Sequence, residues 1–210
     1  GRKRFLITCI ILFTLSSFLC GGAPNLETLL VFRILQGIGG AALIPLSQAI
    51  LMETFPPKEQ GMAMAMWGIG IMAAPILGPT VGGWLTDNYS WRWIFYINFP
   101  MGILTTIMVT MFIFDPPYLK RQSVSIDYMG LILLIIGIGG FQIVLDRGQL
   151  EDWFSSSLIT TSAIISVFSL MTFIIIERLV SHPVIDFNIF RNRTYSAGIF
   201  IMIIMGFGLY

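Results

Sequence analysis

One arginine lies inside an otherwise apolar stretch of this sequence. Arg33 follows Glu27 by six residues within the segment 28–54, and a helical rise of about 1.5 Å per residue puts it roughly 9 Å below the interface if that segment crosses a membrane. A charge at that depth is costly unless it faces protein or water, so it is a functional candidate by default. The chemistry it indicates is a response to the protonation of a nearby acid, because a guanidinium attracts a carboxylate only while the carboxylate is ionised.

Polar and small residues share the helical face of Arg33. They recur at spacings of three, four, seven and about fifteen residues from it, on one face of a helix, and are Gln36, Gly37, Gly40, Ser47 and Gln48. We interpret Arg33, Gln36 and Gln48 as a polar network that tunes proton coupling. The alternative is that the Arg33 side chain extends to the interface and the glycines only pack.

A few other polar residues lie in or beside apolar segments. Gln142 is expected to be buried, where it either hydrogen-bonds a neighbouring helix or lies on a substrate path. Asp127 is expected to cap the amino terminus of the segment 127–145. Glu177, near the end of the segment 158–178, is interpreted as an interfacial anchor.

A glycine- and proline-rich tract lies inside a third apolar segment, 61–85. Gly70, Ala74, Gly78 and Gly82 are four residues apart and form a ridge of small side chains, along which another helix can approach closely. Pro75 and Pro79 each remove a backbone donor, which a membrane helix tolerates when neighbours satisfy the freed carbonyls. The tract predicts close and mobile helix contact.

Several activities have no support in the sequence. It has no GxxxxGK[ST] phosphate loop, HExxH motif, GxSxG motif or Cys/His cluster, so neither nucleotide-driven work nor hydrolysis is indicated, and we expect no enzyme activity, cofactor or metal site. His182 has no clustered ligands, and no long basic run suggests nucleic acid. Cys9 and Cys20 are too far apart along a straight helix to form a disulfide. An ion gradient is the remaining source of energy.

Composition identifies the elements that must position these residues. Hydrophobic residues make up 56% of the 210 residues, charged residues 11%, and the mean hydropathy is +0.84, which is typical of an integral membrane protein. A window of about 20 apolar residues crosses a bilayer. The sequence predicts six complete spans and part of a seventh, at 5–22, 28–54, 61–85, 93–114, 127–145, 158–178 and from 195 onward.

Basic residues predict the sidedness, because they accumulate in cytoplasmic loops. One set of alternate connections holds nine of them: Arg2, Lys3, Arg4, Lys58, Lys120, Arg121, Arg178, Arg191 and Arg193. The other set holds only Arg92 and Arg147. Residue 1 is therefore expected on the cytoplasmic side of the inner membrane.

Six local patterns, in order along the whole chain, carry a family resemblance. They are GRKRFL (1–6), LLVFRILQGIGGAA (29–42), GPTVGG (78–83), WRWIFYINFPMG (91–102), LDRGQLEDWFSS (145–156) and HPVIDFNIFRNRTY (182–195). Together they resemble the major facilitator superfamily, and within it the fourteen-helix drug:proton antiporters of the EmrB/QacA type. GPTVGG resembles the antiporter motif of that family, although Ala65 and Ala74 stand where glycine is expected.

The resemblance implies an all-α polytopic fold, of which this chain is a fragment. Residues 1–114 would be transmembrane helices three to six of the amino-terminal bundle, 115–126 a cytoplasmic linker, 127–178 an inserted hairpin of helices seven and eight, 179–194 a cytoplasmic loop, and 195–210 the start of helix nine and the carboxy-terminal bundle. The acidic residue that this family carries on its first helix would lie outside the chain.

The resemblance also implies a function. It is proton-coupled efflux of hydrophobic or amphiphilic drugs, with Gly78, Pro79, Gly82 and Gly83 as the antiporter motif and Gly1, Arg2 and Lys3 in a cytoplasmic gating loop. A periplasmic adaptor protein and an outer-membrane channel would be partners. The alternatives are a related exporter of a lipid, siderophore or metabolite, and a seven-span receptor that does not transport.

Overall fold

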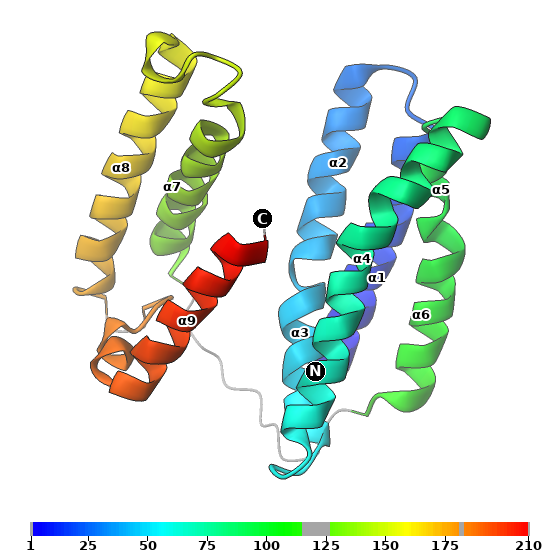
Figure 1. Ribbon diagram of the computed structural model, residues 1–210, viewed down its shortest axis with the longest axis horizontal. Helices are drawn as coiled ribbons and strands as arrows, with labels where there is room; N and C mark the ends of the chain where they lie inside the picture. The colour runs from blue at the N-terminus through cyan, green and yellow to red at the C-terminus, as the bar shows by residue number, and fades with distance from the viewer. Residues whose placement is uncertain (1, 115–126, 181–182, 210) are drawn as a thin grey trace. The chain divides into compact units, whose positions relative to one another are not determined.

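The computed structural model describes residues 2–114, 127–180 and 183–209, and it divides the chain into two units, residues 1–121 and 122–210 (Figure 1). We describe each unit by itself. Six helices in the described residues are long and apolar enough to cross a membrane. These six confirm the six complete spans predicted from the sequence.

Unit 1 contains the first four of these spans. Its helices are α1 (Arg2–Gly21), α2 (Leu26–Ala41), α3 (Leu43–Thr54), α4 (Gln60–Asn88), α5 (Trp93–Tyr96) and α6 (Asn98–Phe112). Helix α1 packs against α2, α3, α5 and α6, and α4 packs against α3 and α5. Helix α1 is therefore the centre of unit 1, and Leu6 and Ile10 on it form a core cluster with Val109 of α6.

Two spans are each divided into two helices, which the hydropathy pattern did not predict. The span Leu26–Thr54 is divided at Ala42, and Trp93–Phe112 is divided at Ile97. In both cases a proline, Pro45 or Pro100, is the third residue of the second helix. Proline cannot donate to the carbonyl four residues earlier but is tolerated in the first turn of a helix, so each proline favours a new helix start. By contrast, α4 continues through Pro75 and Pro79.

Unit 2 contains a helical hairpin followed by a shorter helix. Its elements are α7 (Tyr128–Arg147), the 3-10 turn η1 (Trp153–Ser155), α8 (Ser157–Glu177), the 3-10 turn η2 (Phe187–Arg191) and α9 (Arg193–Leu209). Helices α7 and α8 pack together, and the buried Ser166 hydroxyl of α8 donates to the Gly137 carbonyl of α7 at 2.6 Å. The predicted seventh span corresponds to α9, which starts two residues earlier than expected.

The ends of the hairpin show one correct and one wrong prediction. Asp127 caps α7 by accepting from the Gly130 amide at 2.9 Å, as predicted. Glu177 is not an interfacial anchor, because its side chain is buried and accepts from the Val184 and Ile185 amides at 3.1 and 3.3 Å. The carboxylate therefore holds the chain that follows α8.

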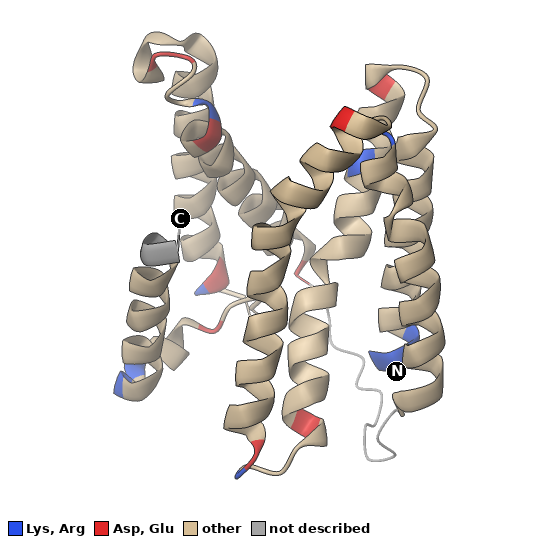
Figure 2. Cartoon of the chain, turned by 45° about the vertical axis from the view of Figure 1, so that its right-hand side comes forward, with Lys and Arg blue, Asp and Glu red and all other residues tan. Residues whose placement is uncertain are grey.

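Charged residues lie mostly toward the helix ends in each unit, and the helix middles are largely without them (Figure 2). In unit 1, Arg2 forms an ion pair with Glu53 at the end of α3, and Lys3 donates to the Thr110 carbonyl of α6. We call this end of unit 1 the Arg2 end. The opposite end holds Arg92 and is called the Arg92 end.

Helices α1 and α2 approach most closely at Gly39. A Cβ atom placed there would lie 2.6 Å from the backbone nitrogen of Phe13 and 3.0 Å from the carbonyl oxygen of Cys9. These are backbone atoms of α1, which cannot move aside as the end of a side chain can. Cys9 and Cys20 of α1 are themselves buried and free, as expected for packing residues.

A second contact fastens the carboxyl end of α1. The Arg92 guanidinium donates to the carbonyl oxygens of Gly21 and Ala23 at 2.9 and 3.0 Å, and it stacks over the Trp91 ring at 5.2 Å. The last carbonyls of a helix have no donors within the helix. Arg92 supplies these donors and thereby ties the start of α5 to the end of α1.

Replacing Gly39 by alanine is expected to destabilise unit 1, and replacing Gly37 is not. The added methyl group at residue 39 overpacks the α1 backbone at a cost of about 1–3 kcal/mol. A methyl group at residue 37 would have no atom of the described residues within 4 Å, so alanine there should be neutral or stabilise by up to about 1 kcal/mol. Thermal unfolding of both variants in detergent checks this, and equal midpoints would contradict it.

Lysine at residue 92 is expected to weaken the junction between α1 and α5. An ammonium group cannot reproduce the two-pronged geometry of the guanidinium, and losing one charge-assisted bond costs roughly 1.5–3 kcal/mol. The free energy of unfolding in mixed micelles measures the effect. Arg147→Lys is the control, because Arg147 is exposed at the end of α7. Equal losses of unfolding free energy in the two variants would show that the bonds from Arg92 to the two carbonyls do not contribute to stability.

Candidate functional site

The polar site predicted around Arg33 lies on α2 toward the Arg92 end of unit 1. Arg33 Nη1 donates to Gln36 Oε1 at 3.1 Å, one helical turn away. The guanidinium carbon also lies 5.2 Å from the centre of the Phe95 ring on α5. Gln36 is only 5% exposed, so the amide that holds Arg33 is itself held by the packing around it.

The neighbours of the Arg33 guanidinium are neutral. In residues 2–114, 127–180 and 183–209 the one ion pair found is between Arg2 and Glu53, and no carboxylate pairs with Arg33. An amide oxygen and an aromatic face stabilise a guanidinium without neutralising its charge. The arrangement can therefore present a positive charge to an acid that comes from another part of the protein.

The backbone of Phe95 is held by hydrogen bonds around the break between α5 and α6. The Ser17 hydroxyl of α1, which is fully buried, donates to the Phe95 carbonyl at 3.0 Å. Asn98 in turn donates to the Ser17 oxygen at 3.0 Å. The backbone that carries the ring in contact with Arg33 is thus held by α1 and by the first turn of α6.

Gln48 does not join this site. It lies on α3, beyond the division at Ala42, and among the described residues no hydrogen bond joins it to Arg33 or Gln36. The fifteen-residue spacing assumed one continuous helix, whereas the span is divided at Ala42, between Arg33 and Gln48. Ser47, from the same predicted stripe, accepts from the Trp67 indole at 3.0 Å and so links α3 to α4.

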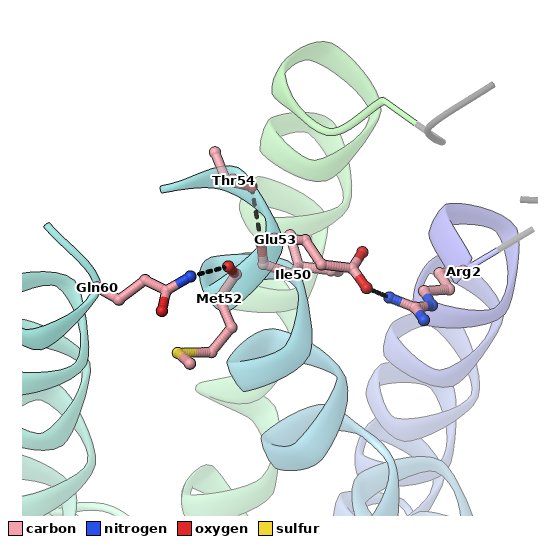
Figure 3. Close-up of polar contacts among 6 residues, drawn as sticks. All are labelled: Arg2, Ile50, Met52, Glu53, Thr54 and Gln60. Atoms are coloured by element: carbon pink, nitrogen blue, oxygen red, sulfur yellow. Dashed lines mark hydrogen bonds and ion pairs between the residues drawn. The ribbon is translucent and has the colours of Figure 1, made fainter. Parts of the chain in front are cut away.

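The predicted gating residues form a second polar cluster, at the Arg2 end. Arg2 and Lys3 belong to the first turn of α1 and not to a loop, as good helix formers allow, and Gly1 lies outside the described residues. Figure 3 shows Arg2 directed at Glu53 near the end of α3, where Gln60 also donates to the Met52 carbonyl at 2.8 Å. A cavity of about 530 Å³ opens between α1, α3 and α6 beside this ion pair.

The antiporter-motif residues lie on α4 with their ridge uncovered. A Cβ atom at Gly70, Gly78 or Gly83 would have no atom within 4 Å in the described structure, and one at Gly82 would only touch Ile94 Cδ1 at 3.9 Å. Pro79 is likewise exposed. The ridge therefore packs against little within unit 1.

Gln142 was expected to be buried, and this prediction is wrong. It is exposed on α7, and its amide donates to the Asp146 carboxylate of the same helix at 3.0 and 3.1 Å. A partner one turn away satisfies the amide without a neighbouring helix. A place on the substrate path stays a prediction.

Sequence reasoning missed Phe95, Ser17 and Arg92. These residues are far from Arg33 in the sequence, and only the fold brings Phe95 to it. One signal was present: the aromatic run WRWIFY directly follows a short loop at the same end of the bundle as Arg33. An aromatic cluster level with an arginine inside an apolar span favours a cation–π contact.

Comparison with known proteins agrees with the resemblance in the sequence. The profile of the Major Facilitator Superfamily matches residues 1–210. The chain is 40% identical to the multidrug export protein EmrB of Haemophilus influenzae, over 94% of the chain and 39% of the relative. It is 40% identical to the probable multidrug resistance protein EmrY of Escherichia coli, over 95% and 39%, and 42% identical to the fatty acid resistance protein FarB of Neisseria gonorrhoeae, over 89% and 36%.

The chain spans about two-fifths of the length of the curated relatives it matches. The profile, in contrast, covers the whole chain, and the membrane-length helices agree with it. The chain therefore belongs to the Major Facilitator Superfamily, a family of transporters rather than enzymes, and is an all-α, multi-pass protein of the inner membrane.

Proposed function

We propose that the full-length protein exports hydrophobic or amphiphilic drugs and toxic compounds across the inner membrane in exchange for protons. The observation that carries this proposal is Arg33, a charge within an apolar span that is held by neutral Gln36 and Phe95. The names of the relatives EmrB and EmrY support a multidrug cargo. No cofactor is needed, because the proton gradient supplies the energy.

Arg33 would respond to an acid on another helix of the full-length protein. While that acid is ionised it attracts the guanidinium, and once it is protonated the attraction ends. Each proton would thereby change which contacts Arg33 makes. A bundle that rocks against its partner around a central cavity could use this change to alternate access.

The other predicted residues take supporting roles in the proposal. The four spans of unit 1 would be helices three to six of the amino-terminal bundle, and α7 and α8 the inserted hairpin. Gly78 and Gly82 on α4 would pack against a helix of the other bundle and govern closure. Arg2 and Lys3 would hold the cytoplasmic ends of α1, α3 and α6 together, as their bonds to Glu53 and Thr110 suggest.

Two points of the proposal concern partners and cargo. A periplasmic adaptor and an outer-membrane channel are proposed because of the likeness to EmrB-type exporters. The relative named for fatty acid resistance favours fatty acids as an alternative cargo. A substrate panel should therefore contain both lipophilic dyes and fatty acids.

Alanine at residue 33 is expected to lower proton-driven efflux at least tenfold, because the acid would lose its charged partner. The full-length protein is expressed in a host without its own pumps, and efflux of lipophilic dyes is measured with and without a protonophore. Arg4→Ala is the matched control, since Arg4 is an exposed arginine in the first turns of α1. Efflux that ignores the protonophore would refute proton coupling, and an active Arg33→Ala would remove Arg33 from the site.

Leucine at Gly78 or Gly82 is expected to reduce transport several-fold while leaving the fold and substrate binding intact. Unit 1 has room for the side chain, whereas a closed helix contact would be overpacked at a cost of about 1–3 kcal/mol. Gly68→Leu is the control, because Gly68 lies on α4 at least ten residues from Gly78 and Gly82, roughly 15 Å along the helix, and also has free space around it among the described residues. Dye efflux and dye binding are measured in parallel, and full efflux in both ridge variants would oppose a role in closure.

A further inference from the structure

The aromatic ring below Arg33 is unusually well fixed. The Phe95 side chain is 9% exposed, and Trp91 meets its ring edge-on at 6.0 Å and 88°. The Phe95 carbonyl is bonded to the buried Ser17 hydroxyl, which also accepts from Asn98. The ring is therefore packed in place, whereas Arg33, which it contacts, is exposed.

Few charges compete for Arg33 at this end of unit 1. The titratable side chains on or next to the helices at this end are Cys20 of α1, Glu27 of α2, Asp87 and Tyr89 at the end of α4, and Arg92 and Tyr96 at α5. Arg92 is held by the carbonyls of Gly21 and Ala23 at and just after the end of α1, and within the described ranges neither acid forms an ion pair with Arg33. The ring and Gln36 are thus the contacts that hold the guanidinium in the structure described.

We propose that Phe95 is a positioning residue that holds Arg33 whenever the proton-binding acid is protonated. This rests on the proposed function, in which Arg33 responds to such an acid. The attraction between a ring and a guanidinium does not change with pH, whereas that of a carboxylate is lost on protonation. The ring and the acid compete for the Arg33 guanidinium. The attraction of the ring is constant, so protonation of the acid decides which of the two Arg33 contacts.

The direction of the effect follows from this competition. The ring stabilises the state in which the acid is protonated and Arg33 has left it. Without the ring, Arg33 stays with the ionised acid, and the acid becomes harder to protonate. The midpoint of the pH profile of efflux should then move to lower pH, by about half a pH unit for a cation–π contact of an exposed guanidinium.

The test uses the full-length protein in proteoliposomes, with dye efflux measured across a series of pH values under a constant pH difference. Phe95→Leu should move the midpoint to lower pH, and Phe95→Tyr should restore the wild-type midpoint because it keeps the ring. Phe99→Leu is the matched control. Phe99 is an aromatic residue of α6 that packs against Phe18 at 5.1 Å and not against Arg33, so its replacement should leave the midpoint unchanged.

Fluorinated phenylalanines at residue 95 give a second measurement if Phe95→Leu does not fold. They keep the shape of the ring and weaken its negative face step by step, so the midpoint should fall with each added fluorine. A midpoint that does not change across this series would overturn the role of Phe95. Wild-type efflux that is insensitive to the proton gradient would instead refute the proposed function, and the inference with it.

Discussion

A bilayer offers no water to a backbone carbonyl, and the architecture of unit 1 depends on that constraint. Every carbonyl that a helix end or a proline frees inside the apolar region needs a donor from the protein. The end of α1 receives its donors from Arg92. The break between α5 and α6 receives one from Ser17, which itself accepts from Asn98. Polar side chains are therefore concentrated where helices end or break.

The same donors prepare the candidate site. Ser17 and Asn98 hold the backbone at the break at Ile97, and with it the residue whose ring contacts the Arg33 guanidinium. The hydrogen bond from Ser17 to the Phe95 carbonyl thus also helps to determine the position of the Arg33 guanidinium. Stability and function are therefore linked through a single residue. A change in the packing of α1 against α5 would displace Phe95 and so alter the position of Arg33.

The sequence predicted well what depends on local composition. Six spans follow from hydropathy, because a helix must be apolar over the thickness of a bilayer whatever its neighbours are. The cap at Asp127 follows from local geometry in the same way. Pro45 and Pro100 are present in the sequence, but a hydropathy pattern does not indicate that a proline begins a new helix within a span. The face that Arg33 and Gln48 share was therefore predicted for one continuous helix, whereas the span is divided at Ala42 between them.

Errors at other residues have a different cause, since they concern contacts between segments distant in sequence. Glu177 looked like an anchor because it ends a span, yet its burial depends on the chain that turns back over it. Gln142 looked buried because its neighbours are apolar, but that says nothing about which face of α7 is covered. Phe95 could not be assigned to Arg33 until the packing of α5 on α1 was known.

The sequence alone does not distinguish glycines that contact another helix within unit 1 from glycines that do not. Gly39 and Gly78 each belong to a run of regularly spaced small residues, and from the sequence either could be the site where two helices approach closely. In the structure Gly39 touches the backbone of α1, whereas Gly78 has no neighbour among the described residues within 4 Å of its Cβ position. Small residues facing lipid give up packing that larger side chains would provide, and glycine also weakens a helix. An uncovered ridge on α4 is therefore costly unless another helix covers it, which is the physical reason to regard the ridge as a contact surface in the full-length transporter.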